Sequence, residues 1–114
     1  MRINQRLLRE AYSIKGSDEL MVKDRLRLPM YLQLAGRNDE GWQELNELNI
    51  RYTDVFDQAE IANQMRIFLQ KEGRYIQAIL FSIWAICKEV DRDRYNLERS
   101  IELADDLALT PMLQ

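Results

Sequence analysis

One run of residues constrains the fold more than any other, and it extends from Tyr75 to Val90 with the sequence YIQAILFSIWAICKEV. Between Ala78 and Cys87 the only polar side chain is Ser82. A half-buried strand would alternate and a surface helix would carry one apolar stripe, so this run predicts a helix packed on most sides. It is shorter than the roughly 20 apolar residues that span a bilayer. We therefore expect a central helix that other helices contact through Ile76, Ile79, Leu80, Ile83, Trp84 and Ile86.

The composition extends this expectation to the whole chain. Four Gly and two Pro in 114 residues are too few for a turn-rich β domain, and strong helix formers fill the periodic segments. The length is that of one domain. The prediction is a single all-α domain over residues 1–114, with five to six helices arranged as stacked antiparallel hairpins.

The first third of the chain contains two predicted helices and a break. Residues 3–15 place apolar side chains on one face of a helix that Gly16 ends. Ser17, followed by two acids, is the expected N-cap of a second helix. Pro29 should kink or break that helix near Leu28, and after a break it would occupy the N1 position of a new helix.

Two glycines are expected to end helices in the rest of the chain. Gly36 should end one helix, with Asn38 as the cap of the next, and Gly73 should end the helix before the apolar run. The candidate caps for the helix between them are Thr53, Asp54 and Asp57. A separate C-terminal helix is expected over about residues 92–109, capped by Asp91 or Asp93.

The chain matches itself at a shift of 37 residues. The matched pairs are Leu32 with Leu69, Gly36 with Gly73, Arg37 with Arg74, and Gly41 with Ala78. Periods of this size are typical of helical repeats, whose units bury their apolar faces by stacking. Two repeat-like hairpins are therefore predicted, at about 24–50 and 56–89.

The segments GRNDEG at 36–41 and GRYIQA at 73–78 resemble the turn and second-helix start of tetratricopeptide repeats. The resemblance implies close helix approach at Gly41 and Ala78, and a groove that binds peptides or proteins. Departures are Pro29 and Arg66 in place of the small first-helix residue, no closing proline at Thr53 or Val90, and a period above about 34 residues. An unrelated compact helical bundle, whose hairpins both turn at Gly, is the alternative.

The sequence offers little for catalysis or ligand binding. It contains no His, which removes the commonest general base and most zinc sites. Cys87 has Lys88 as its only nearby base and apolar neighbours, so we expect a buried and inert thiol. Phosphate-binding glycine motifs are absent, and adjacent acids on a helix diverge. The prediction is a non-enzyme without metal, cofactor or small-molecule substrate.

Charge and aromatic residues give the candidate contact positions. A net charge of -3 argues against binding nucleic acid or an anionic membrane. Arg2, Arg6 and Arg9 nevertheless share one helical face, which could contact phosphate or an acidic protein, although a solvated face is the simpler interpretation. The other candidate partner-binding residues are Tyr31, Trp42 and Tyr52, which could equally pack in the core. The N-terminus lacks the apolar run of a signal peptide, so a cytoplasmic location is expected.

These observations favour a protein–protein interaction module that binds a partner protein or itself. A homodimer is favoured because few helices remain to cover so apolar a central helix. The first alternative is a small inhibitor or antitoxin-like protein that blocks a macromolecular machine, a class that includes phage-type anti-defence proteins. The second is a nucleic-acid-binding regulator that acts through its arginine faces and whose affinity falls steeply with salt.

Overall fold

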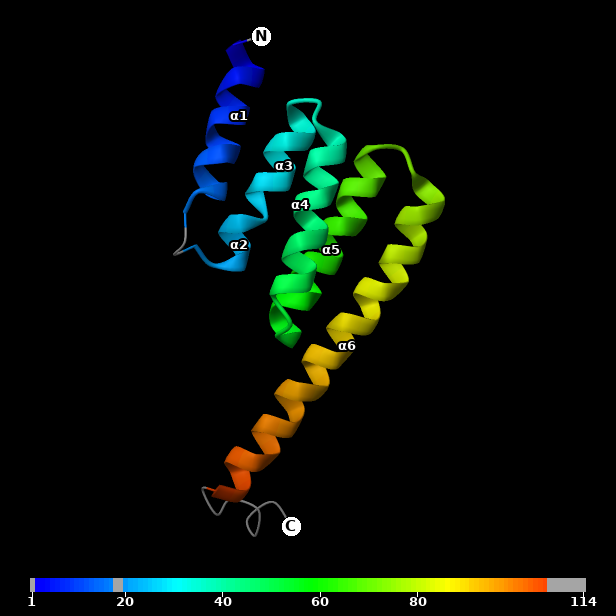
Figure 1. Ribbon diagram of the computed structural model, residues 1–114. Helices are drawn as coiled ribbons and strands as arrows, with labels where there is room; N and C mark the ends of the chain where they lie inside the picture. The colour runs from blue at the N-terminus through cyan, green and yellow to red at the C-terminus, as the bar shows by residue number, and fades with distance from the viewer. Residues whose placement is uncertain (1, 18–19, 107–114) are drawn as a thin grey trace.

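The computed structural model describes residues 2–17 and 20–106, and its regular elements there are all helices (Figure 1). These helices are α1 (Arg2–Lys15), α2 (Val22–Arg25), α3 (Arg27–Leu34), α4 (Asn38–Arg51), α5 (Val55–Lys71) and α6 (Tyr75–Asp106). The predicted all-α class with packed neighbouring helices is confirmed.

The helices pack in a row that follows the chain. Helix α1 packs on α3, α3 on α4, α4 on α5, and α5 on α6. The molecule is accordingly elongated and thin, with extents of 65 × 35 × 21 Å (Figure 1). Helix α6 lies at one edge of the row and α1 at the other, so the expectation that the apolar run forms a central helix is wrong.

Two clusters of buried side chains hold the row together. The larger lies between α2, α4 and α5, and its members are Val22, Leu26, Leu45, Leu48, Ile61, Met65 and Phe68. The smaller joins α1 to α3 through Ala11, Ile14, Leu28 and Leu32. Neither cluster includes an aliphatic side chain of α6, which contributes only the partly buried rings of Phe81 and Trp84 to the larger one.

The predicted break before Pro29 exists, but it falls at Leu26, between α2 and α3. Pro29 is the third residue of α3, two positions later than N1, and its missing N–H is one that the first helical turn leaves unpaired. Helix continues from Met30 to Leu34, as the apolar sequence there predicts.

Arg25 explains how the segment before this break is fixed. Its side chain is buried, with Nη2 donating to the Ser17 carbonyl at 2.7 Å and Nε donating to the Leu20 carbonyl at 3.1 Å. The predicted cap at Ser17 does not begin a helix directly, because α2 starts at Val22. The two acids after Ser17 lie outside the described residues.

The turns at Gly36 and Gly73 have the same geometry. Both glycines have positive φ angles, 83° and 79°, which favour residues without a side chain. After each glycine an arginine N–H returns to a leucine carbonyl: Arg37 to Leu32 at 2.8 Å, and Arg74 to Leu69 at 3.0 Å. This is the hydrogen-bond pattern of a Schellman motif, which ends α3 and α5 as predicted.

One of the three candidate caps for α5 is confirmed, and the cap of α4 lies one residue before the predicted Asn38. Asp54 caps α5, since its carboxylate accepts from the N–H groups of Phe56 at 2.8 Å and Asp57 at 3.2 Å. Asn38 is the first residue of α4 and not its cap, because Arg37 occupies the cap position without a side-chain hydrogen bond.

Helix α6 runs without interruption from Tyr75 to Asp106, so the separate helix predicted from about 92 is a continuation of the apolar run. Neither Gly nor Pro occurs in this stretch, and the proposed caps could not by themselves break it. Asp91 and Asp93 lie inside the helix, where they pair with Arg94 at 3.7 Å and Arg92 at 3.5 Å. The last residues of the predicted span, 107–109, lie outside the described part.

Candidate interaction surface

The inner face of α6 packs on α5 through small and aromatic side chains. Ala78 and Ala85 are buried, two turns apart. Phe81 lies between Trp42 of α4 and Trp84, with ring centroids 5.5 Å apart in both edge-on contacts. Trp42 also contacts Phe68 of α5 at 5.7 Å. These contacts use one side of α6 and leave the other side free.

The outer face of α6 presents a continuous line of exposed apolar residues, which we call the α6 stripe. Its members are Ile76, Ile79, Leu80, Ile83, Ile86, Cys87 and Val90. The six aliphatic side chains are between 56% and 79% exposed. At 100° per residue, Ile83 lies opposite the buried Ala78 and Ala85, so the stripe points directly away from α5.

Exposure of this surface is energetically costly. Fully burying an Ile or Leu side chain stabilises a protein by about 1.5–3 kcal/mol. Each aliphatic residue of the stripe is mostly exposed and therefore lacks about 1–2 kcal/mol of this burial free energy. Single exposed apolar residues are ordinary, but a contiguous line of them marks an interaction site. No charged side chain occurs from Tyr75 to Cys87 to oppose such an interaction.

Cys87 belongs to this surface. Its side chain is exposed, so the sequence-based expectation of a buried thiol is wrong. The neighbours that suggested burial lie on both faces of the helix: Trp84 packs inward, whereas Ile86 is exposed beside Cys87.

The C-terminal part of α6 extends beyond the row of helices (Figure 1). The edge-on contact of Tyr95 with Phe56 of α5, 5.6 Å between ring centroids, is made close to the start of α5. Every residue from Asp93 to Leu103 is exposed, including Leu97 and Ile101, which continue the direction of the stripe.

The predicted contact residues do not form one site. Tyr31 is half-buried against the α1–α3 cluster, and Trp42 and Tyr52 are half-buried against the larger cluster. Arg6 and Arg9 are exposed on α1, at the opposite edge of the row from α6. The side chain of Arg2 lies outside the described part of the chain.

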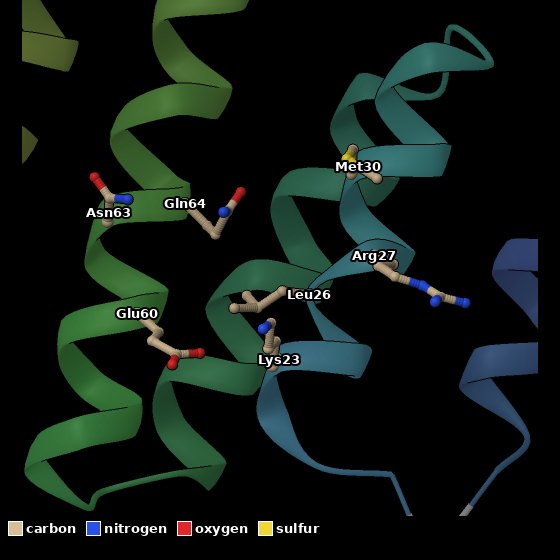
Figure 2. A pocket seen from close by; sticks show the side chains of 7 residues that line it. All are labelled: Lys23, Leu26, Arg27, Met30, Glu60, Asn63 and Gln64. Atoms are coloured by element: carbon tan, nitrogen blue, oxygen red, sulfur yellow. The ribbon is translucent and has the colours of Figure 1, made fainter.

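A hollow of about 300 Å³ lies between α2, α3 and α5. Figure 2 shows Glu60, Asn63 and Gln64 on the α5 side, with Lys23 and Leu26 facing them and Arg27 directed away. The guanidinium of Arg27 instead lies 5.9 Å from the centre of the Tyr31 ring. The hollow is therefore lined by mixed, mostly polar side chains, unlike the apolar α6 stripe.

Polar contacts attach α1 to α4. Lys15 Nζ lies 2.7 Å from a carboxylate oxygen of the nearly buried Glu44, and this contact raises the pKa of Lys15 above its usual 10.5. The Tyr12 hydroxyl donates to Glu40 at 2.9 Å, which raises the pKa of the phenol above 10.0. Desolvation and the nearby Asp54 raise the pKa of Asp57 above 3.8, at the start of α5.

Within residues 2–17 and 20–106, no group of three or more His, Cys, Asp or Glu side chains is placed to hold a metal ion. Among the helices of the same residues, none has the length and apolar character needed to cross a membrane.

Comparisons of the chain with models of known protein families, with curated proteins and with solved structures found no match.

The residues of the α6 stripe could not be told apart in the sequence by polarity alone, because the opposite face of the helix is apolar as well. Ala78, Phe81, Trp84 and Ala85 are also apolar, so the run reads as apolar all round. Six of the seven stripe residues are aliphatic, and from Ala78 to Ala85 the inner face carries only aromatic or small ones. That difference between the two faces is the signal from which the stripe could have been predicted.

Proposed function

We propose that this chain is a non-enzymatic protein–protein interaction module that binds its partner through the α6 stripe. One observation carries the proposal: the stripe is apolar, uncharged from Ile76 to Cys87 and exposed along four helical turns. A partner that covered it would recover the burial free energy that the isolated chain forgoes.

The shape of the stripe favours a helix as the partner. Ile76, Ile83 and Val90 are spaced by seven residues, as are Ile79 and Ile86. This is the a and d pattern of helices that pack along their length with side chains interlocked. The branched side chains of the stripe can interdigitate with those of a neighbouring helix.

We further propose that the pairs α3–α4 and α5–α6 are divergent tetratricopeptide-like units. The matching turns at Gly36 and Gly73 support this, as do the buried Gly41 and Ala78 at equivalent positions. A repeat unit buries its apolar face on the next unit of the stack. On this account the α6 stripe is the surface on which a following unit would pack, and another protein takes its place.

Photo-crosslinking in cells of the native host tests the proposal. A benzoylphenylalanine at Leu80 should give adducts of discrete mass, whether with another protein or with a second copy. The same probe at Gln43, which is exposed on α4, is the control and should give none. Absence of an adduct from Leu80, or equal labelling from both positions, would contradict an interaction through α6.

A further inference from the structure

The spacing of the α6 stripe is the same in both directions along the helix. From Ile76 to Val90, the residue number increases from one member of the stripe to the next by three, one, three, three, one and three. The sequence of intervals is therefore symmetric about Ile83. An isologous interface requires a patch that complements itself after a two-fold rotation, and for two antiparallel helices that rotation reverses the order of residues.

We propose that the α6 stripe binds the α6 stripe of a second copy, antiparallel, across a two-fold axis near Ile83. The proposal rests on the proposed function and specifies its partner. Rotation about this axis places Ile76 opposite Val90 of the second copy, Ile79 beside Ile86, and Leu80 beside Cys87. Each aliphatic residue of one stripe then meets the apolar stripe of the other.

Charge favours the antiparallel arrangement over the parallel one. Arg94 is the next residue in the direction of the stripe after Val90, and its side chain is largely exposed. In a parallel pair in register, the two Arg94 guanidinium groups, each 3.7 Å from the Asp91 carboxylate of its own chain, would stand at the same level, and so would the two Asp91 carboxylates, so that like charges lie side by side. In the antiparallel pair the two Arg94 groups lie at opposite ends, about 30 Å apart along the helix axis, and the uncharged segments from Tyr75 to Cys87 overlap.

The natural Cys87 provides a probe of this geometry. Leu80 and Cys87 lie two turns apart on the same edge of the stripe, three residues before and four residues after Ile83. In the proposed dimer, residue 80 of one copy and Cys87 of the other differ by about 1.5 Å in their positions along the helix axis. The two Cys87 residues differ in level by about 12 Å, beyond the roughly 7 Å between Cα atoms that a disulfide tolerates.

The experiment compares three purified chains under mild oxidation with copper phenanthroline. The natural sequence should remain uncrosslinked, Leu80→Cys should form a disulfide-linked dimer, and Leu80→Cys with Cys87→Ser should again remain uncrosslinked. Leu80 is 61% exposed, so its replacement should leave the fold intact, which circular dichroism checks for each chain. Only the antiparallel pairing predicts that both cysteines are needed for one cross-link.

Two results would overturn the proposal. A disulfide dimer of the natural sequence through Cys87 would show that the helices pair in parallel. A lack of cross-linking in all three chains, with a monomer in sedimentation, would show that the second copy is not the partner. The first result would leave the proposed function standing, because a parallel dimer also binds a protein through the stripe. After the second result, the proposed function stands if Leu80 photo-crosslinks to another protein in cells, and fails if it does not.

Discussion

The approach of α4 to its neighbours depends on the missing side chain of Gly41. A Cβ atom added there would lie 3.0 Å from the Pro29 carbonyl oxygen and 3.0 Å from Cε2 of Phe68. The first of these atoms is backbone, and the Phe68 ring is buried against Trp42. Neither neighbour can move freely, so Gly41 sets the distance between α3, α4 and α5.

Gly41→Ala is therefore expected to lower the free energy of unfolding by about 1 kcal/mol, because overpacking of about 1–3 kcal/mol exceeds the helix propensity gained. Gly16→Ala is the control, since its added Cβ would meet nothing closer than 3.6 Å. It should change stability by less than about 0.5 kcal/mol. Urea unfolding of both variants gives the comparison, and equal midpoints would be inconsistent with a tight crossing.

The attachment of α1 should weaken at alkaline pH. The folded state raises the pKa values of Tyr12 and Lys15 above 10.0 and 10.5, so both groups hold their protons more tightly when folded. Their contribution is fully present below the unfolded pKa values and is lost as pH rises through the raised ones. Melting temperatures should fall more steeply there for the natural chain than for Tyr12→Phe with Lys15→Gln. Parallel curves would show that these contacts do not stabilise α1.

For single residues, helix ends and caps could be predicted from the residue and its near neighbours in the sequence, whereas the burial of a side chain could not. Gly36 and Gly73 end their helices because the positive φ that the turn needs is a local property of glycine. Asp54 caps α5 by accepting from the N–H groups of Phe56 and Asp57, two and three residues later in the chain. The burial of Arg25 depends on a chain reversal eight residues earlier, and the exposure of Cys87 depends on which helix packs where; neither follows from adjacent residues.

Among the elements, α6 joins two environments in one helix. Its first three turns bury Ala78 and Ala85 on α5, whereas Asn96 to Leu103 is exposed throughout. Backbone amides near packed side chains exchange slowly, and those of an unsupported helical end exchange quickly. Hydrogen exchange should therefore be slow from Ala78 to Ala85 and fast beyond Asn96. Equal protection along the helix would mean that the distal part is covered as well.

The contact between α5 and α6 requires a small residue at position 78. Ala78→Leu should overpack this crossing and lower the free energy of unfolding by about 1–3 kcal/mol. Gln77→Leu is the matched control, because Gln77 is the adjacent exposed residue of the same helix. If thermal melts showed both variants as stable as the natural chain, the equivalence of Ala78 with Gly41 would lose its main support.

At the scale of the whole molecule, the sequence predicted the helices but not the order in which they pack. An apolar run such as Tyr75 to Val90 indicates that both faces of a helix are to be covered, and it does not say by which chain. Helix α1 packs on α3 at the far edge, so it does not cover α6. Helix α6 has the apolar composition of a buried helix but lies at the edge of the row. This difference is the basis for assigning its outer face to a partner.

Sedimentation velocity across a hundredfold concentration range tests most directly whether a second copy covers the α6 stripe. The natural chain should shift towards a species of about 27 kDa, twice the 13.6 kDa of one chain. Ile83→Glu places a charge on the proposed axis and should remain a monomer, whereas Gln77→Glu adds the same charge off the stripe and should associate as the natural chain does. A single species of 13.6 kDa for all three chains at every concentration would contradict the account.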